Sequence, residues 1–407
     1  MSNIKQITGG VCAPQGFKAG GIHCGIAKAF DKKDLALIVS DIPCAAAAVY
    51  TTNVVKAAPL NVTKKHLENG MAQAIICNSG NANACTADAM DVANEMCSIA
   101  ASALSLEPED IVVASTGVIG VSLNPHPIDA GMPRLVEDIN IEGSDACAAA
   151  IMTTDTLKKE IAVEFEISGK TCRIGAICKG SGMIHPNMGT MLCFITTDVD
   201  ITSEMLDYAL GMVVPDTFNM VSVDGDTSTN DMAVMLANGI SANVQISKED
   251  ENFRQFVQAL MVVCIYLSRM IAKDGEGATK LLECSVEGAP DDKTARTLAK
   301  SVITSSLFKA AMYGADANWG RVLCAMGYSG AEFDPQTVSV SFASKAGEID
   351  VCKKGAGVTF SEAVAKQVLS EDEIEIKISL GDGEGQAVAW GCDLTYDYVK
   401  INGDYRS

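Results

Sequence analysis

Three stretches of the chain alternate apolar and polar residues with a period of two. They lie at 161–167, 338–342 and 374–380, where isoleucine, valine, phenylalanine and leucine occupy every second position. A period of two places one face of a strand against a core and the other toward polar surroundings. We therefore expect half-buried strands in the middle and in the last third of the chain.

Helical spacing separates these strands. Apolar residues recur every three or four positions over 88–104, 203–213 and 253–272, and the last segment ends at the glycine-rich sequence 274–277. The longest apolar run, 259–267, is far shorter than the roughly 20 residues of a membrane span, so it predicts a buried helix. Mixed strands and helices without a 20–50-residue repeat predict an α/β or α+β fold.

Turn-forming residues suggest where the chain divides. The sequence Gly288-Ala289-Pro290-Asp291-Asp292 predicts a boundary near 288–292, before a C-terminal domain. The run Gly381 to Gly385 lies between two apolar stretches and predicts a hairpin turn, not a nucleotide-binding loop. A chain of 407 residues is expected to hold two or three domains.

Charge and cysteine usage narrow the function. A net charge of −20 without a dense basic patch argues against nucleic acid or an anionic membrane as a partner. The 15 cysteines form no Cys-x-x-Cys pair, and the N-terminus lacks a signal-peptide layout, so we expect a cytoplasmic protein with cysteines in its core. The oxygen-rich segment 224–231 lacks the loop length of a calcium site, and we predict no metal.

The most informative segment surrounds Gly189 and Thr190. A threonine hydroxyl can attack the preceding carbonyl when the preceding residue is small, and the Thr190 amine released by cleavage could then activate its own hydroxyl. The same letters also fit a plain turn followed by a strand from Met191 to Ile195. Local pattern leaves both interpretations open.

Five segments together are similar to one family. Lys179-Gly180-Ser181-Gly182-Met183 followed by Asn187-Met188-Gly189-Thr190-Met191-Leu192 resembles the autocleavage motif of the ornithine acetyltransferase family, self-processing acyltransferases of arginine biosynthesis. The resemblance covers essentially the whole chain. Four further segments match in order: Ser115 to Gly120, Met152 to Thr156, Asp274 to Lys280, and the terminus Lys400 to Ser407.

The resemblance implies roles for particular residues. Thr190 would be the nucleophile, with cleavage between Gly189 and Thr190, and Thr116 and Gly117 would form the oxyanion hole. From sequence alone, the segment 115–117 also fits an ordinary turn after a strand. Lys179 would suit a substrate carboxylate and Glu276 a substrate ammonium. The residues expected to contact the substrate are Thr153, Lys179, Thr190, Glu276, Asn402 and Ser407.

The resemblance also implies a fold and a reaction. We expect a layered αββα core of the DmpA-like type with a smaller C-terminal domain, cut into chains 1–189 and 190–407 that assemble as an α2β2 heterotetramer. The expected enzyme is a glutamate N-acetyltransferase that moves acetyl from N-acetylornithine to glutamate through an acetyl-threonine, without a cofactor. Use of acetyl-CoA as a second donor stays open.

Two alternatives remain at this level. An N-terminal-nucleophile aminopeptidase or amidase would cleave itself in the same way but pass the acyl group to water. A non-catalytic amino-acid-binding protein of the same fold would keep its chain intact. The role of the segment Asn78 to Asn83 is also open between the active site and simple turn formation.

Overall fold

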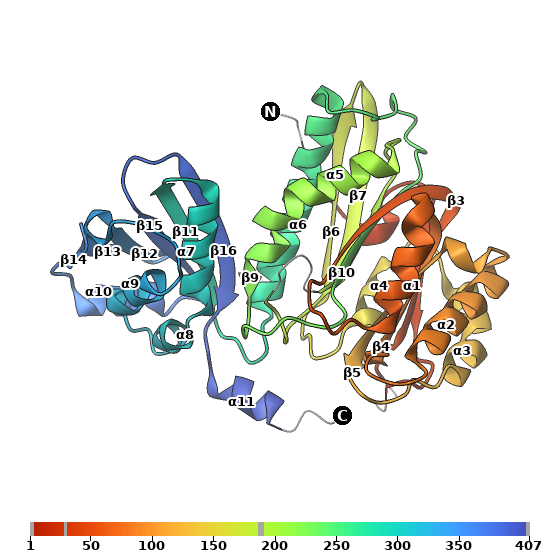
Figure 1. The fold of residues 1–407 in the computed structure, drawn as a ribbon, viewed down its shortest axis with the longest axis horizontal. Coiled ribbons are helices and arrows are strands. Elements are labelled where there is room, and N and C mark those ends of the chain that lie inside the picture. The colour runs from red at the N-terminus through yellow and green to blue at the C-terminus, as the bar shows by residue number, and fades with distance from the viewer. Residues whose placement is uncertain (1–3, 28–30, 186–190, 404–407) are drawn as a thin grey trace.

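Two β-sheets organise the computed structural model, which describes residues 4–27, 31–185 and 191–403 (Figure 1). The first sheet has the strand order β1-β6-β7-β8-β10-β3-β4-β5, with β2 paired to β3. Its strands are β1 (Lys5–Ile7), β2 (Phe17–Ile22), β3 (Leu35–Tyr50), β4 (Met71–Asn81), β5 (Ile111–Val118), β6 (Lys159–Ile167), β7 (Lys170–Lys179), β8 (Leu192–Thr197) and β10 (Met232–Ala237).

The first sheet folds back on itself through the long strand β3. The first half of β3 pairs with β2 and β4, its second half pairs with β10, and the pairing with β4 shifts register between Val39 and Cys44. A shared apolar cluster fills the space between the two halves, with Ile75 from β4 and Phe194 and Val234 from β8 and β10. The two halves therefore form two stacked layers.

Helices cover both outer faces of these layers. The helices α1 (Ala58–His66), α2 (Ala89–Leu104) and α3 (His126–Asp138) lie in one apolar cluster with β4 and β5 on one outer face. The short helix α4 (Ser144–Ile151) is different, because it packs against β2 and β3 and its buried residues belong to the cluster between the layers. On the other outer face, α5 (Ser203–Val213) and α6 (Glu251–Lys273) share a cluster with β6, β7 and β8. The expected αββα core is confirmed.

Alternation along the strands explains this layering. In β8, Cys193 and Ile195 contact the cluster of α5 and α6, whereas Leu192 and Phe194 contact the cluster between the layers. A strand buried on both faces needs a continuous apolar run, which β8 has. This is why 191–195 looks apolar at every position.

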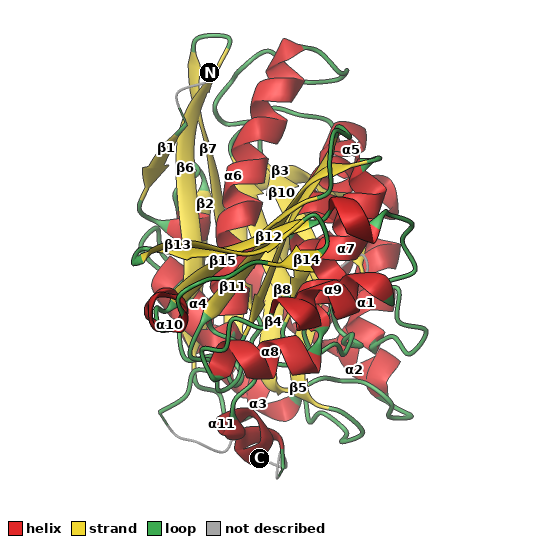
Figure 2. Cartoon of the chain, turned by 90° about the vertical axis from the view of Figure 1, so that its left-hand side faces the viewer, coloured by secondary structure: helices red, strands yellow, loops and turns green. Residues whose placement is uncertain are grey.

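The second sheet forms the other lobe, toward the blue end of the colour scale (Figure 1). Its order is β14-β13-β12-β15-β11-β16-β9, and helix α6 lies between it and the first sheet (Figures 1 and 2). Its strands are β9 (Val221–Ser222), β11 (Leu281–Ala289), β12 (Ser339–Ser344), β13 (Gly347–Lys353), β14 (Ala356–Gly357), β15 (Glu373–Ser379) and β16 (Gly385–Cys392). Its helices are α7 (Asp292–Thr304), α8 (Ser306–Tyr313), α9 (Trp319–Gly327) and α10 (Glu362–Leu369), and α11 (Tyr396–Asn402) follows the last strand.

Helix α6 was predicted from its apolar spacing and is 23 residues long. Asp250 caps its first turn by accepting from the Phe253 N–H at 3.2 Å. By length and composition alone the helix could cross a membrane, but half of its most apolar window is buried inside the protein. We therefore interpret α6 as a core helix between the two sheets.

Two sequence expectations concern turns of the second lobe. Residues 288–292 run from the end of β11 into the start of α7, and Asp291 accepts from the Thr294 N–H as the cap of α7. The domain boundary near these residues stays a prediction. The segment 381–385 does not close a hairpin, because β15 and β16 lie on opposite sides of β11. The loop crosses the end of β11 instead, and Leu380 donates its N–H to Glu287.

Candidate active site

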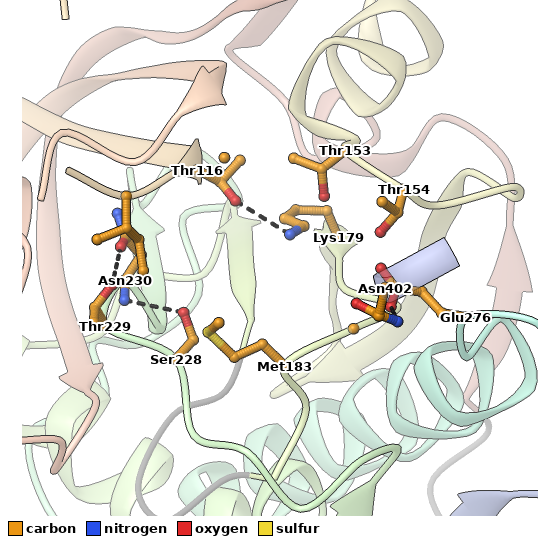
Figure 3. A pocket seen from close by; sticks show the side chains of 13 residues that line it. Thr116, Thr153, Thr154, Lys179, Met183, Ser228, Thr229, Asn230, Glu276 and Asn402 are labelled. Carbon is orange, nitrogen blue, oxygen red and sulfur yellow. Dashed lines mark hydrogen bonds between the residues drawn. The ribbon is translucent and has the colours of Figure 1, made fainter. Parts of the chain in front are cut away.

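A cavity of about 120 Å³ lies where the ends of several first-sheet strands meet the C-terminal helix (Figure 3). Six predicted site residues from separate parts of the chain line it. They are Thr116, Gly117, Thr153, Lys179, Glu276 and Asn402. The cavity is also lined by Ile119, Thr154, Gly182, Met183, Ser228, Thr229 and Asn230.

Thr116 and Gly117 lie at the end of β5, which runs parallel to β4. Gly117 has φ +133°, and a Cβ there would lie 2.3 Å from the carbonyl carbon of Gly80 on β4. Only glycine tolerates both this backbone conformation and this approach. The glycine thus lets the strand end turn into the cavity beside Thr116.

Lys179 is the last residue of β7 and brings a positive charge to the same wall. Its ammonium donates to the Thr116 hydroxyl at 3.2 Å, and Figure 3 shows both side chains at the cavity. An ammonium carries three N–H donors and this contact uses one, so the ammonium can also bind a negative group in the cavity.

Thr153 and Thr154 belong to the loop between α4 and β6. The Thr153 N–H donates to Asp155 at 3.0 Å, and the Thr154 and Ser181 hydroxyls are 2.7 Å apart. Lys32 donates to the Thr153 carbonyl at 2.8 Å. The loop is therefore fixed on both sides, with the Thr153 and Thr154 side chains at the cavity (Figure 3).

Glu276 follows helix α6 and carries the negative charge of the site. It is only 8% exposed, and the Asn402 side chain donates to its Oε2 at 2.7 Å. Its N–H donates to the Ser181 carbonyl at 2.9 Å. Gly182 makes room for it, since a Cβ at 182 would lie 2.4 Å from the carboxylate carbon.

A buried ion triad supports the loops that carry these residues. The Lys159 ammonium lies 2.7 Å from Asp155 and 2.5 Å from Asp274, and its side chain is fully buried. Asp155 also accepts from the Gly180 N–H at 2.7 Å, next to Lys179. Asp274 accepts from the Thr156 N–H at 3.1 Å, so Lys159 links the threonine loop to the segment that holds Glu276.

Sequence reasoning missed the loop from Ser228 to Asp231, which it considered only as a metal ligand set. The Asn230 amide donates to the carbonyls of Ala82 and Ser115 at 2.7 and 2.8 Å, which holds the end of β5 in place. Asp231 is 3% exposed, and burial raises the pKa of its carboxyl well above the usual range against the opposing charge of Lys179. The run of polar residues directly before the apolar strand β10 was the signal available in the sequence.

Three predicted residues lie outside the described part of the chain. They are Gly189, Thr190 and Ser407. Met191, which follows Thr190 in the sequence, is buried, and its carbonyl accepts from the Met232 N–H at 2.8 Å. The residue roles in cleavage, oxyanion stabilisation and substrate contact stay predictions.

The segment Asn78 to Asn83 shapes the end of β4. The Asn78 amide donates to the Asn81 carbonyl at 2.9 Å, and Asn81 Oδ1 accepts from the Asn83 N–H at 2.7 Å. The Asn83 amide donates to the Ala89 carbonyl at 3.0 Å, at the start of α2. These contacts fit the turn-forming interpretation left open by the sequence.

Comparisons with known proteins identify the family. The sequence model of the ArgJ family matches residues 18–407. The arginine biosynthesis bifunctional protein ArgJ 1 of Clostridium acetobutylicum is 53% identical over 395 residues, covering 96% of each chain. The chain belongs to the ArgJ family. This confirms the family and the enzyme class predicted from the sequence, an acyltransferase of arginine biosynthesis.

Solved ArgJ-family structures also match this chain. A crystal structure of the argJ bifunctional protein from Bacillus halodurans is 45% identical, with a TM-score of 0.49, and the match covers 52% of this chain and 97% of that one. The ornithine acetyltransferase of Mycobacterium tuberculosis, solved in complex with ornithine, is 35% identical, with a TM-score of 0.43, and the match covers 46% of this chain and 100% of that one.

Proposed function

We propose that this ArgJ-family chain transfers an acetyl group from N-acetylornithine to glutamate, by way of an ester on Thr190. The observation that carries the proposal is the convergence of Thr116, Thr153, Lys179, Glu276 and Asn402 on one cavity. These residues come from five separate parts of the chain. They bring together a positive and a negative charge, and a zwitterionic amino acid needs both for its recognition.

The charges in the cavity suit the substrate. Lys179 offers an ammonium to an α-carboxylate, and Glu276, held by Asn402, offers a carboxylate to the δ-ammonium of ornithine. Glutamate brings carboxylates and no second ammonium, so it would use Lys179 more than Glu276. One cavity would thus bind the acetyl donor and the acceptor one after the other, although the two differ in charge.

Acyl transfer would proceed in two half-reactions. The Thr190 hydroxyl attacks the acetyl carbonyl, the negative oxygen is stabilised by Thr116 and Gly117, and ornithine leaves with a proton on its nitrogen. Glutamate then attacks the acetyl-threonine ester. Both steps use side chains and backbone alone, and no cofactor is expected.

We further propose that Thr190 becomes available when the chain cuts itself at Gly189/Thr190. Denaturing intact mass of the purified protein tests this together with the chemistry, before and after exposure to N-acetylornithine without acceptor. Fragments 1–189 and 190–407, with one acetyl added to the second, are expected, and Thr190→Ala should stay whole. An unbroken and unmodified wild-type chain would contradict the proposal.

Product analysis separates the transferase from its alternatives. With glutamate present, N-acetylglutamate should form at the rate at which ornithine appears, whereas an amidase would release acetate. The same assay with acetyl-CoA replacing N-acetylornithine decides whether the chain uses a second donor.

We also expect two copies of each fragment to assemble. Helix α11 exposes Tyr396 at 83% and Val399 at 67%, an apolar surface directly beside the site residue Asn402. Such a surface fits a contact with a second copy. Light scattering of the purified protein should give an α2β2 mass, and Val399→Glu should lower it. The free cysteines are consistent with work in the reducing cytoplasm.

A further inference from the structure

A second, larger cavity borders two loops that also wall the candidate active site. Its volume is about 740 Å³, against about 120 Å³ for the candidate site. Met183 and Ser228 line the smaller cavity, whereas His185 and Thr227, their near neighbours in sequence, line the larger one. The Thr227 hydroxyl donates to the His185 carbonyl at 2.7 Å, which joins the two loops. The two cavities are therefore neighbours, and among the described residues they share no lining side chain.

Positive charge gathers on the wall of the larger cavity, although the chain has a net charge of −20. Arg296 and Lys300 line it from one face of α7, four residues apart, and the described lining residues include no Asp or Glu. The Lys300 ammonium donates to the Asn219 carbonyl, which holds it at this wall. Asp216 pairs with Arg296, with its Oδ2 3.0 Å from Nη2, but an arginine has further N–H donors. The two cations therefore outnumber the one carboxylate, as an anionic ligand requires.

Hydroxyl groups add donors to the same wall. Ser305 caps α8 by accepting from the Phe308 N–H at 3.3 Å, and Ser329 accepts from the Ala331 N–H at 3.2 Å. Each contact uses a lone pair of the serine oxygen and leaves the hydroxyl proton to donate elsewhere. Both serines line the cavity, so both can donate to an anion there. Two cations and two hydroxyls exceed what the two oxygens of a carboxylate need, and they suit a phosphate group.

The size of the cavity indicates a ligand larger than a single amino acid. Pockets of about 300–1,000 Å³ hold ligands of drug size, and this cavity lies in that range. Tyr328 lines the cavity and is 63% exposed, so its ring is open to a planar partner. Aromatic side chains stack on nucleotide bases. The wall thus fits a ligand that joins a planar ring to a phosphate.

The burial of Lys300 favours an anion beside it. Burial lowers the pKa of the Lys300 ammonium to about 7, and burial together with the charge of Lys300 lowers the pKa of His185 to about 4. A negative group next to a buried ammonium stabilises its charged form. An anionic ligand would therefore offset part of the cost of placing this cation in the wall.

We propose that this cavity binds a phosphate-bearing ligand of nucleotide size. Lys300 and Arg296 contact the phosphate, Ser305 and Ser329 donate to its oxygens, and Tyr328 packs against the ring. Two sources carry such a phosphate, a free nucleotide and the nucleotide end of coenzyme A, and the experiment below distinguishes them. The proposal concerns binding alone, so it does not rest on acetyl transfer or on self-cleavage.

Isothermal titration calorimetry of the purified full chain at low salt tests the proposal with ADP, coenzyme A, adenosine and inorganic phosphate. ADP or coenzyme A should bind with a Kd below about 0.1 mM, and adenosine, which lacks a phosphate, at least about tenfold more weakly. Tighter binding of ADP would assign the cavity to a free nucleotide, and tighter binding of coenzyme A to the nucleotide end of that molecule. No binding of either, or inorganic phosphate binding as tightly as both, would overturn the proposal.

A pair of variants locates the ligand. Lys300→Met keeps the length of the side chain and removes its charge, and Lys293→Met is the matched control, because Lys293 is exposed on the same helix and does not line the cavity. Lys300→Met should raise the Kd of the better ligand at least about tenfold, the loss expected for one hydrogen bond to a charged group. Lys293→Met should bind as the wild type does. Folded Lys300→Met with wild-type affinity would overturn the proposal.

A surface variant protects the test against a folding defect in Lys300→Met. Tyr328 is exposed, so Tyr328→Ser should keep the wild-type melting temperature. It should weaken the binding of ADP or coenzyme A several-fold and leave the affinity for inorganic phosphate unchanged, since it removes only the surface offered to the ring. Wild-type affinity of Tyr328→Ser for both nucleotide ligands would overturn the assignment of this cavity to a ligand of nucleotide size.

Discussion

Replacing Lys159 with methionine removes the cation that lies between Asp155 and Asp274. Methionine keeps the length of the side chain and fills the buried space, so the change deletes charge with little loss of packing. Both carboxylates stay buried, because the Asp155 and Asp274 side chains are 0% and 2% exposed. They then lack the ammonium that each contacts in the wild-type protein.

The expected cost is about 3–5 kcal/mol of unfolding free energy, the range found when one partner of a buried ion pair is removed. We expect the loss of unfolding free energy to stay within that range, because both carboxylates keep backbone N–H donors. Asp155 keeps the N–H groups of Thr153 and Gly180, and Asp274 keeps that of Thr156. These donors stabilise the carboxylates, but they do not cancel the repulsion between two of them.

The stability that the Asp155 carboxylate contributes depends on pH, and the sign of this dependence follows from its pKa. Burial acts to raise the pKa of Asp155, but Lys159 and Lys179 outweigh it and lower the pKa to about 2. Because the unfolded value is about 3.9, this carboxylate contributes stability above about pH 4 that is lost as the pH falls toward 2. In the Lys159→Met variant, burial dominates and a carboxylate can take up a proton, so its deficit should shrink as the pH falls from 7 toward 4.

Urea unfolding followed by circular dichroism at pH 7 and pH 5 measures both effects. Lys158→Met is the matched control, since the neighbouring lysine pairs with Asp145 on the surface and should cost no more than about 1 kcal/mol. A Lys159→Met deficit at pH 7 no larger than that of the control would refute the claim that the triad holds these loops together, and a deficit that grows from pH 7 to pH 5 would refute the pH argument.

Three smaller changes address the cavity. Gly117→Ala introduces a Cβ 2.3 Å from the Gly80 carbonyl carbon at φ +133°, so its melting temperature should fall and its kcat should drop; a wild-type melting curve with full activity would contradict this. Gly182→Ala presses on the Glu276 carboxylate, so we expect KM for N-acetylornithine to rise about tenfold, equivalent to ~1.4 kcal/mol, with thermal stability nearly unchanged. Asn402→Ala removes the donor to Glu276, worth about 1.5–3 kcal/mol for a charged acceptor, and should raise the same KM while leaving KM for glutamate less affected; equal effects on both would argue against the assigned charge partners.

The regular elements could be predicted from periodicity because burial repeats with the geometry of each element. The helix at 203–213 has the predicted bounds, and α6 extends the predicted 253–272 by a few residues at its ends. The connections between these elements were harder to predict. The glycine-rich segment 381–385 has the composition of a hairpin turn, but composition does not say which strand lies between the two that it joins.

The candidate site shows a similar limit. Motif positions predicted that Thr116, Lys179 and Glu276 belong together, and they line one cavity. Asp231 was considered only as part of an oxygen-rich segment, because a buried carboxyl oxygen without a partner among the described residues is a property of packing that no residue pattern encodes. Lys159 was missed for a related reason, since a lone lysine in a strand is usually solvated and its two acidic partners come from different loops.

The order of strands in the first sheet explains why a cut at Gly189/Thr190 need not release half of the protein. Strands β8 and β10 follow the cut in sequence, yet in the sheet they lie between β7 and β3, which precede it. Six pairs of residues join β7 to β8 and six join β10 to β3, and the apolar cluster between the layers takes residues from both sides of the cut. Lys159 and Asp274 add an ion pair across the same division. The two fragments would therefore separate only when this sheet unfolds, and the described walls of the cavity would stay in place after the cut.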